Sequence, residues 1–97
     1  HIHDRRQRQM CIRDSILAIS KDKNEFLVIE LKKGRASDIV LGQIQRYMGF
    51  IKKNLAENKS VKGLIIALED DKNLKDALSV APNIKFMKYE VSFKLTE

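Results

Sequence analysis

The sequence predicts a single α/β domain built on a mixed central β-sheet. Two apolar runs, at 26–29 and 61–68, are typical of strands that are covered on both faces. A stretch with the helical period of apolar residues separates these runs, and a shorter helical stretch follows the second run. Strand and helix patterns thus alternate in the order β-β-α-β-α-β, which favours an α/β architecture.

The composition is that of one soluble globular domain. The chain has 97 residues, of which 43% are hydrophobic and 33% charged, and its formal net charge is +6. No apolar run approaches the roughly 18–20 residues of a membrane-spanning helix, so we expect no membrane partner. Cys11 is the single cysteine, which excludes an intrachain disulfide and favours a cytoplasmic location.

Residues 1–14 differ from the rest of the chain. They contain both histidines, Cys11 and four of the six arginines, and they show no periodic apolar face. The segment resembles translated sequencing-adapter sequence at the end of a metagenomic gene fragment. We therefore interpret 1–14 as a non-native extension and 15–97 as the domain, which is still basic. The alternative is a basic arm that binds nucleic acid.

The first predicted element is a β-hairpin. Residues 16–20 form a short apolar strand, 21–24 a polar turn, and 25–31 the second strand. Glu30 interrupts the apolar run of this second strand, and a buried carboxylate is costly unless it is paired or binds a metal. Side chains two residues apart on a strand share a face, so Glu30 and Lys32 point the same way.

A long helix follows from about Ser37 to residue 54 or 55. Ser37 is a good N-cap, and Asp38 suits the positive end of the helix dipole. Gln43 and Tyr47 stand four residues apart and therefore share one face of this helix. The predicted apolar stripe consists of Val40, Ile44, Tyr47, Met48, Ile51 and Leu55.

The remaining elements are one strand, a short helix and a final strand pair. Residues 61–68 form a second central strand, and the acidic residues 69–71 end it and cap a helix over 72–79. Pro82 breaks that helix. Residues 84–89 and 91–95 alternate between large apolar and polar residues, so both are predicted as strands.

Two motifs occur together in the central part of the chain. Glu30-Leu31-Lys32 matches E-x-K at a strand end, and Gln43 and Tyr47 match Q-x-x-x-Y on the next helix. With these motifs, the run from Ile16 to Leu95 resembles the PD-(D/E)XK nuclease superfamily, in particular the C-terminal nuclease domain of NucS-type endonucleases. The resemblance implies a restriction-endonuclease-like core, in which helices flank a mixed central sheet.

The same resemblance implies a metal-dependent endonuclease that hydrolyses DNA phosphodiester bonds with Mg²⁺ (or Mn²⁺). Glu30 would bind the metal together with the backbone carbonyl of Leu31. Lys32 would orient or help to deprotonate the attacking water, or stabilise developing charge. Gln43 would fix the site from the helix, and Tyr47 would contact DNA or brace the helix against the sheet.

The first Asp of the family motif is absent. Ser15 stands in its place, immediately before Ile16-Leu17-Ala18. Asp14 is one residue off, which points a strand side chain to the opposite face. Because the family core begins with a helix, we expect the N-terminal helix to be missing, and the first strand is in question as well. We therefore expect impaired activity, and an N-terminal domain in the full-length protein.

Plainer interpretations stand beside these assignments. Glu30 and Lys32 could form an ordinary ion pair. Gln43 could make a helix-to-loop hydrogen bond, and Tyr47 could be a core residue. The resemblance implies that Lys33 and Arg35 bind phosphates that flank the scissile bond, whereas the plainer interpretation is solvated surface. The acidic residues 69–71 fit a helix cap better than a second metal site.

Three functions follow from these alternatives. We prefer a metal-dependent nuclease domain that acts on DNA. The second is a catalytically inactive relative that binds nucleic acid through the same basic groove, and the third is a small α/β interaction module. DNA is the expected partner of the first two, and a homodimer is left open.

Overall fold

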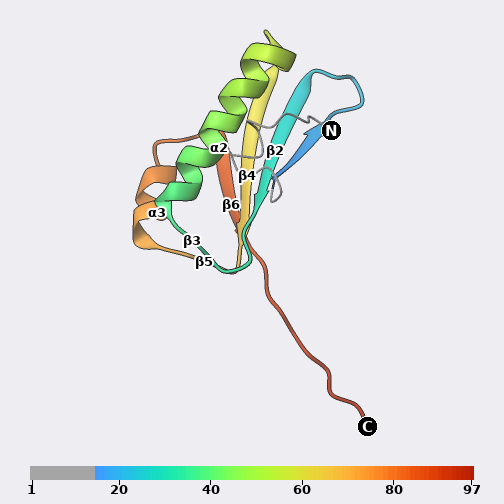
Figure 1. Ribbon diagram of the computed structural model, residues 1–97, viewed down its shortest axis with the longest axis vertical. Helices are drawn as coiled ribbons and strands as arrows, with labels where there is room; N and C mark the ends of the chain where they lie inside the picture. Colours follow the sequence, from blue (N-terminus) through green and yellow to red (C-terminus); the bar gives the residue numbers. More distant parts are fainter. Residues whose placement is uncertain (1–14) are drawn as a thin grey trace, which may run out of the picture.

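The computed structural model describes residues 15–97, and Figure 1 shows their arrangement. The expectation that residues 1–14 are a non-native extension falls outside this range. The elements in chain order are β1 (Ser15–Ile19), β2 (Glu25–Leu31), β3 (Arg35–Ala36), α2 (Asp38–Ile51), the π-helix η2 (Lys52–Ala56), β4 (Ser60–Ala67), β5 (Glu69–Asp70), α3 (Lys72–Leu78) and β6 (Ile84–Lys88).

The central sheet is mixed, as the sequence predicts. Its strand order is β1-β2-β4-β6, in which β1 pairs antiparallel with β2 while β2–β4 and β4–β6 are parallel. The apolar strands β2 and β4 occupy the two central positions because each can bury side chains on both faces. The predicted hairpin is confirmed, with its first strand shifted by one residue to Ser15–Ile19.

Helix α2 covers one face of the sheet and forms the core with it (Figure 1). The face carries Phe26, Val28 and Glu30 of β2, all buried, and Gly63 of β4 lies beside Val28. A Cβ atom built at Gly63 would lie 2.8 Å from Sδ of Met48, so only glycine lets the helix approach the sheet this closely.

The last turn of the long helix is a π-helix. Its signature bond runs from the amide of Glu57 to the carbonyl of Lys52, at 2.9 Å and five residues apart. The wider turn shifts the helical phase, so Ala56 is buried in the core whereas Leu55 is exposed. The predicted apolar stripe is therefore correct as far as Ile51 and wrong at Leu55.

The second helix and a small strand pair complete the domain. Helix α3 packs against α2 and β6, and its Leu74 is fully buried. The two-residue strands β3 and β5 pair in parallel at the end of the domain where β2 and β4 terminate. The sequence analysis does not predict this pair.

One predicted strand is wrong. Residues 91–95 belong to no strand, and the chain after β6 leaves the body of the domain as an extended segment (Figure 1). Among residues 15–97, no helix has the length and apolar character that crossing a membrane requires.

Candidate active site

The candidate site is built around Glu30, near the end of the central strand β2. Glu30 alternates with Phe26 and Val28 and therefore faces α2, and its exposure is only 2%. It is the single buried charged residue in the part of the chain that the structure describes. A carboxylate at this depth needs strong partners, since burial penalises its charged form.

Ser15 is the first of these partners. In the β1–β2 ladder Ser15 lies directly opposite Glu30, and its Oγ donates a hydrogen bond of 2.5 Å to Glu30 Oε1. This is the position at which the sequence analysis expects the missing Asp of the motif. The register therefore places residue 15 beside Glu30, with a neutral hydroxyl where a second carboxylate is expected.

Lys32 is the second partner. Its Nζ lies 3.8 Å from Oε2 of Glu30, and the Lys32 side chain is 26% exposed. The strand period thus places the ammonium and the carboxylate on the same side of the sheet, as predicted. The amide of Lys32 donates to the carbonyl of Ile66 at 2.9 Å, which fixes the backbone from which this side chain projects.

Helix α2 supplies Gln43 and Tyr47 on the same side of the sheet. Tyr47 is buried in the core, and its burial and then the negative charge of Glu30 raise its pKa above the usual value. This burial favours the bracing role of Tyr47 over a DNA contact. One turn earlier, Oε1 of Gln43 is buried and has no hydrogen-bond partner, so it is an acceptor left unused inside the domain.

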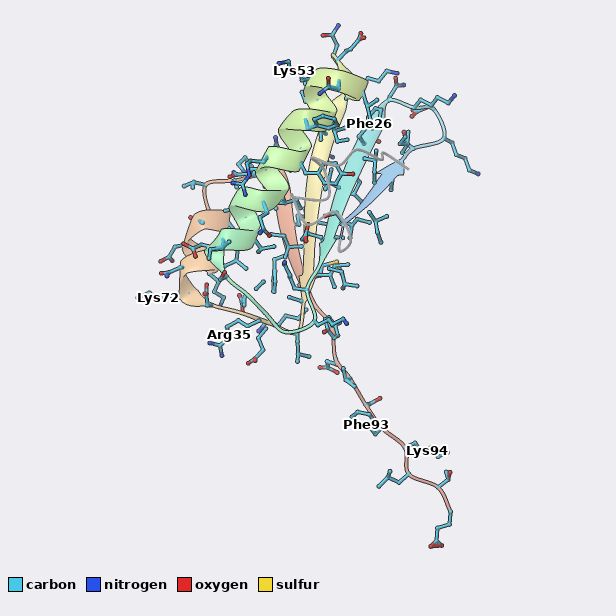
Figure 2. The ribbon with its side chains drawn as sticks, viewed as in Figure 1. Phe26, Arg35, Lys53, Lys72, Phe93 and Lys94 are labelled. Atoms are coloured by element: carbon cyan, nitrogen blue, oxygen red, sulfur yellow. The ribbon has the colours of Figure 1, made fainter. Side chains whose placement is uncertain are left out.

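The basic residues of the predicted site lie in the connection from β2 to β3. Lys33 and Arg35 are both exposed, and Arg35 makes a solvent-exposed ion pair with Glu69, with Nη2 and Oε1 3.8 Å apart. Figure 2 shows Arg35 at the end of the domain body opposite to Lys53. The structure thus brings Glu30, Lys32 and Tyr47 together and leaves Lys33 and Arg35 on the nearby surface.

Tyr89 makes contacts that the sequence analysis does not predict. Its Oη donates to the carbonyl of Lys33 at 2.7 Å, and its amide donates to the carbonyl of Ala67 at 3.1 Å. The amide of Leu68 donates to the carbonyl of Gly34 at 3.0 Å. These bonds hold the turn that carries Lys32 and Lys33. A separation of 56 residues between Tyr89 and Lys33 leaves no local signal for this contact.

The acidic residues 69–71 do not form a second site. Asp71 is the N-cap of α3 and its Oδ1 accepts from the amide of Leu74 at 2.7 Å. Oδ1 of Asp70 lies 3.4 Å from Nζ of Lys88, and Glu69 forms an ion pair with Arg35. The interpretation of this run as a helix cap rather than a metal site agrees with these contacts.

The oxygen atoms around Glu30 are of the ligand type that a hard divalent cation prefers, but together they carry too little negative charge to bind one well. Mg²⁺ prefers oxygen ligands, and the unused Oε1 of Gln43 is one such atom beside the carboxylate side of the sheet. Within residues 15–97, however, no three His, Cys, Asp or Glu side chains gather into a cation-binding group. The described residues thus offer one carboxylate and one hydroxyl where the motif has two carboxylates.

No family model and no curated protein matches the chain. Among solved structures, it is similar to a repair endonuclease from Pyrococcus abyssi, with 30% identity and a TM-score of 0.62 over 76% of this chain and 31% of that one. It is also similar to EndoMS in its apo form (24% identity, TM-score 0.65, 81% of this chain and 33% of that one).

A complex of EndoMS with dsDNA gives a third match (24% identity, TM-score 0.62, 80% of this chain and 31% of that one). The chain spans about a third of the length of each of these proteins. The fold of these structures is the α/β fold that the sequence predicts. The resemblance of this chain to NucS-type repair endonucleases is thereby confirmed.

Proposed function

We propose that this domain belongs to an endonuclease that hydrolyses DNA phosphodiester bonds with Mg²⁺ or Mn²⁺, and that the chain as it stands is nearly inactive. The observation that carries the proposal is the pairing of Ser15 with Glu30. A carboxylate at residue 15 would lie opposite Glu30, where the two side chains would share a cation. The similarity to repair endonucleases, one of them in a complex with dsDNA, supports DNA as the substrate.

Each residue of the site has a role in this proposal. Glu30 and the carbonyl of Leu31 would hold the cation, which when bound supplies Lewis-acid stabilisation of the phosphate and a more acidic water. Lys32, whose ammonium lies 3.8 Å from Glu30 Oε2, would orient the water or stabilise charge that develops on the phosphate. Gln43 would accept a hydrogen bond at its unused Oε1, and Tyr47 would hold α2 against the sheet.

The phosphate contacts would come from the β2–β3 connection. Lys33 and Arg35 are exposed beside the end of β2, and contacts from such side chains to flanking phosphates position DNA without reading its sequence. Tyr89 holds the carbonyl of Lys33 and so limits the freedom of this connection.

The impairment follows from charge. A single carboxylate paired with a lysine and a serine hydroxyl leaves little net negative charge to attract a divalent cation. Loss of one electrostatic contributor typically costs about 10²–10³ in rate, and loss of the cation should cost more. We therefore expect that Ser15→Asp raises cation-dependent nicking of DNA, and that Glu30→Ala in the Ser15→Asp background abolishes it.

The test is a plasmid-nicking assay of these two variants and the unmodified chain, each with Mn²⁺, with Mg²⁺ and with chelator. If the unmodified chain already cuts in a cation-dependent way that Glu30→Ala removes, the assignment of residue 15 is wrong. If Ser15→Asp nicks no faster than the unmodified chain, a missing carboxylate at this position does not explain the inactivity.

A second candidate is a catalytically inactive domain that binds DNA. The partners of Glu30 favour it, because the Ser15 hydroxyl binds Oε1 and the Lys32 ammonium faces Oε2 without any cation. This candidate predicts salt-sensitive DNA binding with no cleavage in either background, since phosphate contacts weaken steeply with salt.

A further inference from the structure

Gly34 lies in the connection between β2 and β3, two residues beyond Lys32. No glycine of the described chain has a positive φ angle, so the backbone at Gly34 is one that other residues also adopt. A Cβ atom built there would meet no atom within 4 Å, in contrast to Gly63, where it would lie 2.8 Å from Sδ of Met48. The fold itself therefore does not explain the glycine. A glycine in open space does let another molecule approach the main chain closely.

The amide of Gly34 is a donor that the domain does not use. Gly34 is exposed, and no described residue accepts a hydrogen bond from its amide. The carbonyl of the same residue, by contrast, accepts from the amides of Leu68 and Glu69 at 3.0 and 3.5 Å. One side of this residue is thus bonded to the domain, and the other side offers an N–H group to solvent or to a ligand.

Tyr89 fixes the direction of this amide. Its Oη donates to the carbonyl of Lys33 at 2.7 Å, and that carbonyl belongs to the same peptide unit as the amide of Gly34. In a trans peptide the carbonyl and the amide point in opposite directions, and the described chain has no cis peptide bond. The Gly34 amide therefore points away from Tyr89. The amide of Tyr89 donates to the carbonyl of Ala67 at 3.1 Å, which anchors the tyrosine to the end of β4.

Two cations flank the amide. Lys33 is exposed and makes no ion pair within residues 15–97, and Arg35 has only an exposed contact of 3.8 Å with Glu69. A neutral donor between two cations suits an anion with several acceptor oxygens, as a phosphate has. The Cα atoms of Lys32 and Gly34 are at most about 7 Å apart, because they are two residues apart. The anion would therefore lie next to the candidate active site.

We propose that the amide of Gly34 donates a hydrogen bond to a DNA phosphate next to the scissile one, and that Tyr89 is the positioning residue that orients this amide. The proposal rests on the proposed function, since it needs DNA at the β2–β3 connection. Backbone amides are common phosphate donors that position DNA without reading its sequence. Because an amide is neutral, this contact adds affinity without releasing a counterion, whereas a contact from Lys33 releases one.

The direct test is a titration of the isotope-labelled full chain with a short DNA duplex in chelator, followed in proton–nitrogen correlation spectra. We expect DNA to shift the Gly34 amide proton downfield and to slow its exchange with water by at least about tenfold, as for one hydrogen bond to a charged group. The amide of Gly49, in the middle of α2, should not respond. In Tyr89→Phe the response of Gly34 should be largely lost.

The outcomes of this titration separate the proposal from the proposed function. If the amides of Lys33 and Arg35 respond and that of Gly34 does not, the connection binds DNA without the proposed contact, and the proposal is overturned. If no amide of the chain responds, DNA binding itself is absent and the proposed function fails as well. An equal Gly34 response in the unmodified chain and in Tyr89→Phe would overturn the role of Tyr89.

The second test measures duplex affinity over a salt series for Gly34→Ala and its matched control Gly49→Ala, since neither new methyl group meets an atom within 4 Å. We expect Gly34→Ala to weaken binding by about fivefold at every salt concentration with an unchanged salt slope, because no cation is lost. Its thermal stability should not fall. Adding Tyr89→Phe to Gly34→Ala should weaken binding little further, since both act on one contact. Equal affinities of Gly34→Ala and Gly49→Ala would overturn the proposal.

Discussion

Ser15 and Glu30 face each other across the β1–β2 ladder, and the Ser15 hydroxyl donates a 2.5 Å hydrogen bond to the buried carboxylate. A neutral donor at this position stabilises the charge of Glu30, whereas an aspartate would repel it. The same pair therefore has two opposite properties. It stabilises the fold in the absence of a cation, and it removes the second carboxylate that a cation site would use.

The first prediction concerns the stability of Ser15→Asp. In chelator the variant should lose roughly 1–3 kcal/mol of unfolding free energy, because a hydrogen bond to a buried carboxylate is lost and a like charge is added. Mn²⁺ should restore stability by about 2.7 kcal/mol at a hundredfold excess over its Kd. Urea unfolding with and without Mn²⁺ measures both effects, with exposed Ser92→Asp as the control. A loss that Mn²⁺ does not reverse would contradict the shared site.

The second prediction concerns the close approach of α2 and β4. Gly63→Ala should destabilise the domain by about 1–3 kcal/mol, because the new methyl group would lie 2.8 Å from Sδ of Met48. Gly49→Ala is the matched control, since a Cβ there meets no atom within 4 Å. In the middle of a helix that change should stabilise by roughly 0.5–1 kcal/mol. Thermal unfolding of both variants measures these changes. Equal changes in stability for the two variants would contradict the packing account.

The third prediction concerns Tyr47 at high pH. Its raised pKa means that above about pH 10 the unfolded chain loses the phenol proton before the folded one does. Stability should therefore fall as pH rises through that range, by up to about 1.4 kcal/mol per pH unit. Tyr47→Phe should flatten this fall in urea unfolding between pH 9 and 11 by about that amount. Tyr89→Phe, the control with the other tyrosine, should keep the steep dependence.

The fourth prediction concerns DNA binding. Lys33→Ala and Arg35→Ala should each weaken binding of duplex DNA and reduce the slope of log K against log salt by about 0.9 per lost phosphate contact. Lys53→Ala removes the same charge in η2, at the opposite end of the domain body, and should leave the slope unchanged (Figure 2). Fluorescence anisotropy over a salt series gives the slopes. Equal slopes for all three variants would mean that the β2–β3 connection does not contact DNA.

The sequence was sufficient to predict the elements whose patterns are long and regular. Strand β2 has the predicted bounds, since an apolar run with one interrupting carboxylate has few other interpretations. The helix α2 begins after the predicted N-cap Ser37, whose Oγ accepts from the amide of Ile39. The positions of Glu30 and Lys32 on one side of the sheet followed from the strand period alone.

Features that depend on tertiary contacts could not be predicted. The π-turn that exposes Leu55 leaves the apolar spacing of the helix unchanged until its last residues. The bond from Tyr89 to Lys33 joins distant parts of the chain. Residues 91–95 alternate between apolar and polar residues, as a strand does. This pattern indicates only that one side is suited to burial, and it does not identify a neighbouring strand.

The most direct test of the central claim is a titration with Mn²⁺, followed by the electron paramagnetic resonance signal of the free ion. The account predicts that Ser15→Asp binds one ion per chain at least tenfold more tightly than the unmodified chain, about 1.4 kcal/mol. Glu30→Ala in the Ser15→Asp background should lose that gain. Equal Mn²⁺ affinity of the unmodified chain and Ser15→Asp would contradict the claim that residue 15 and Glu30 form two halves of one cation site.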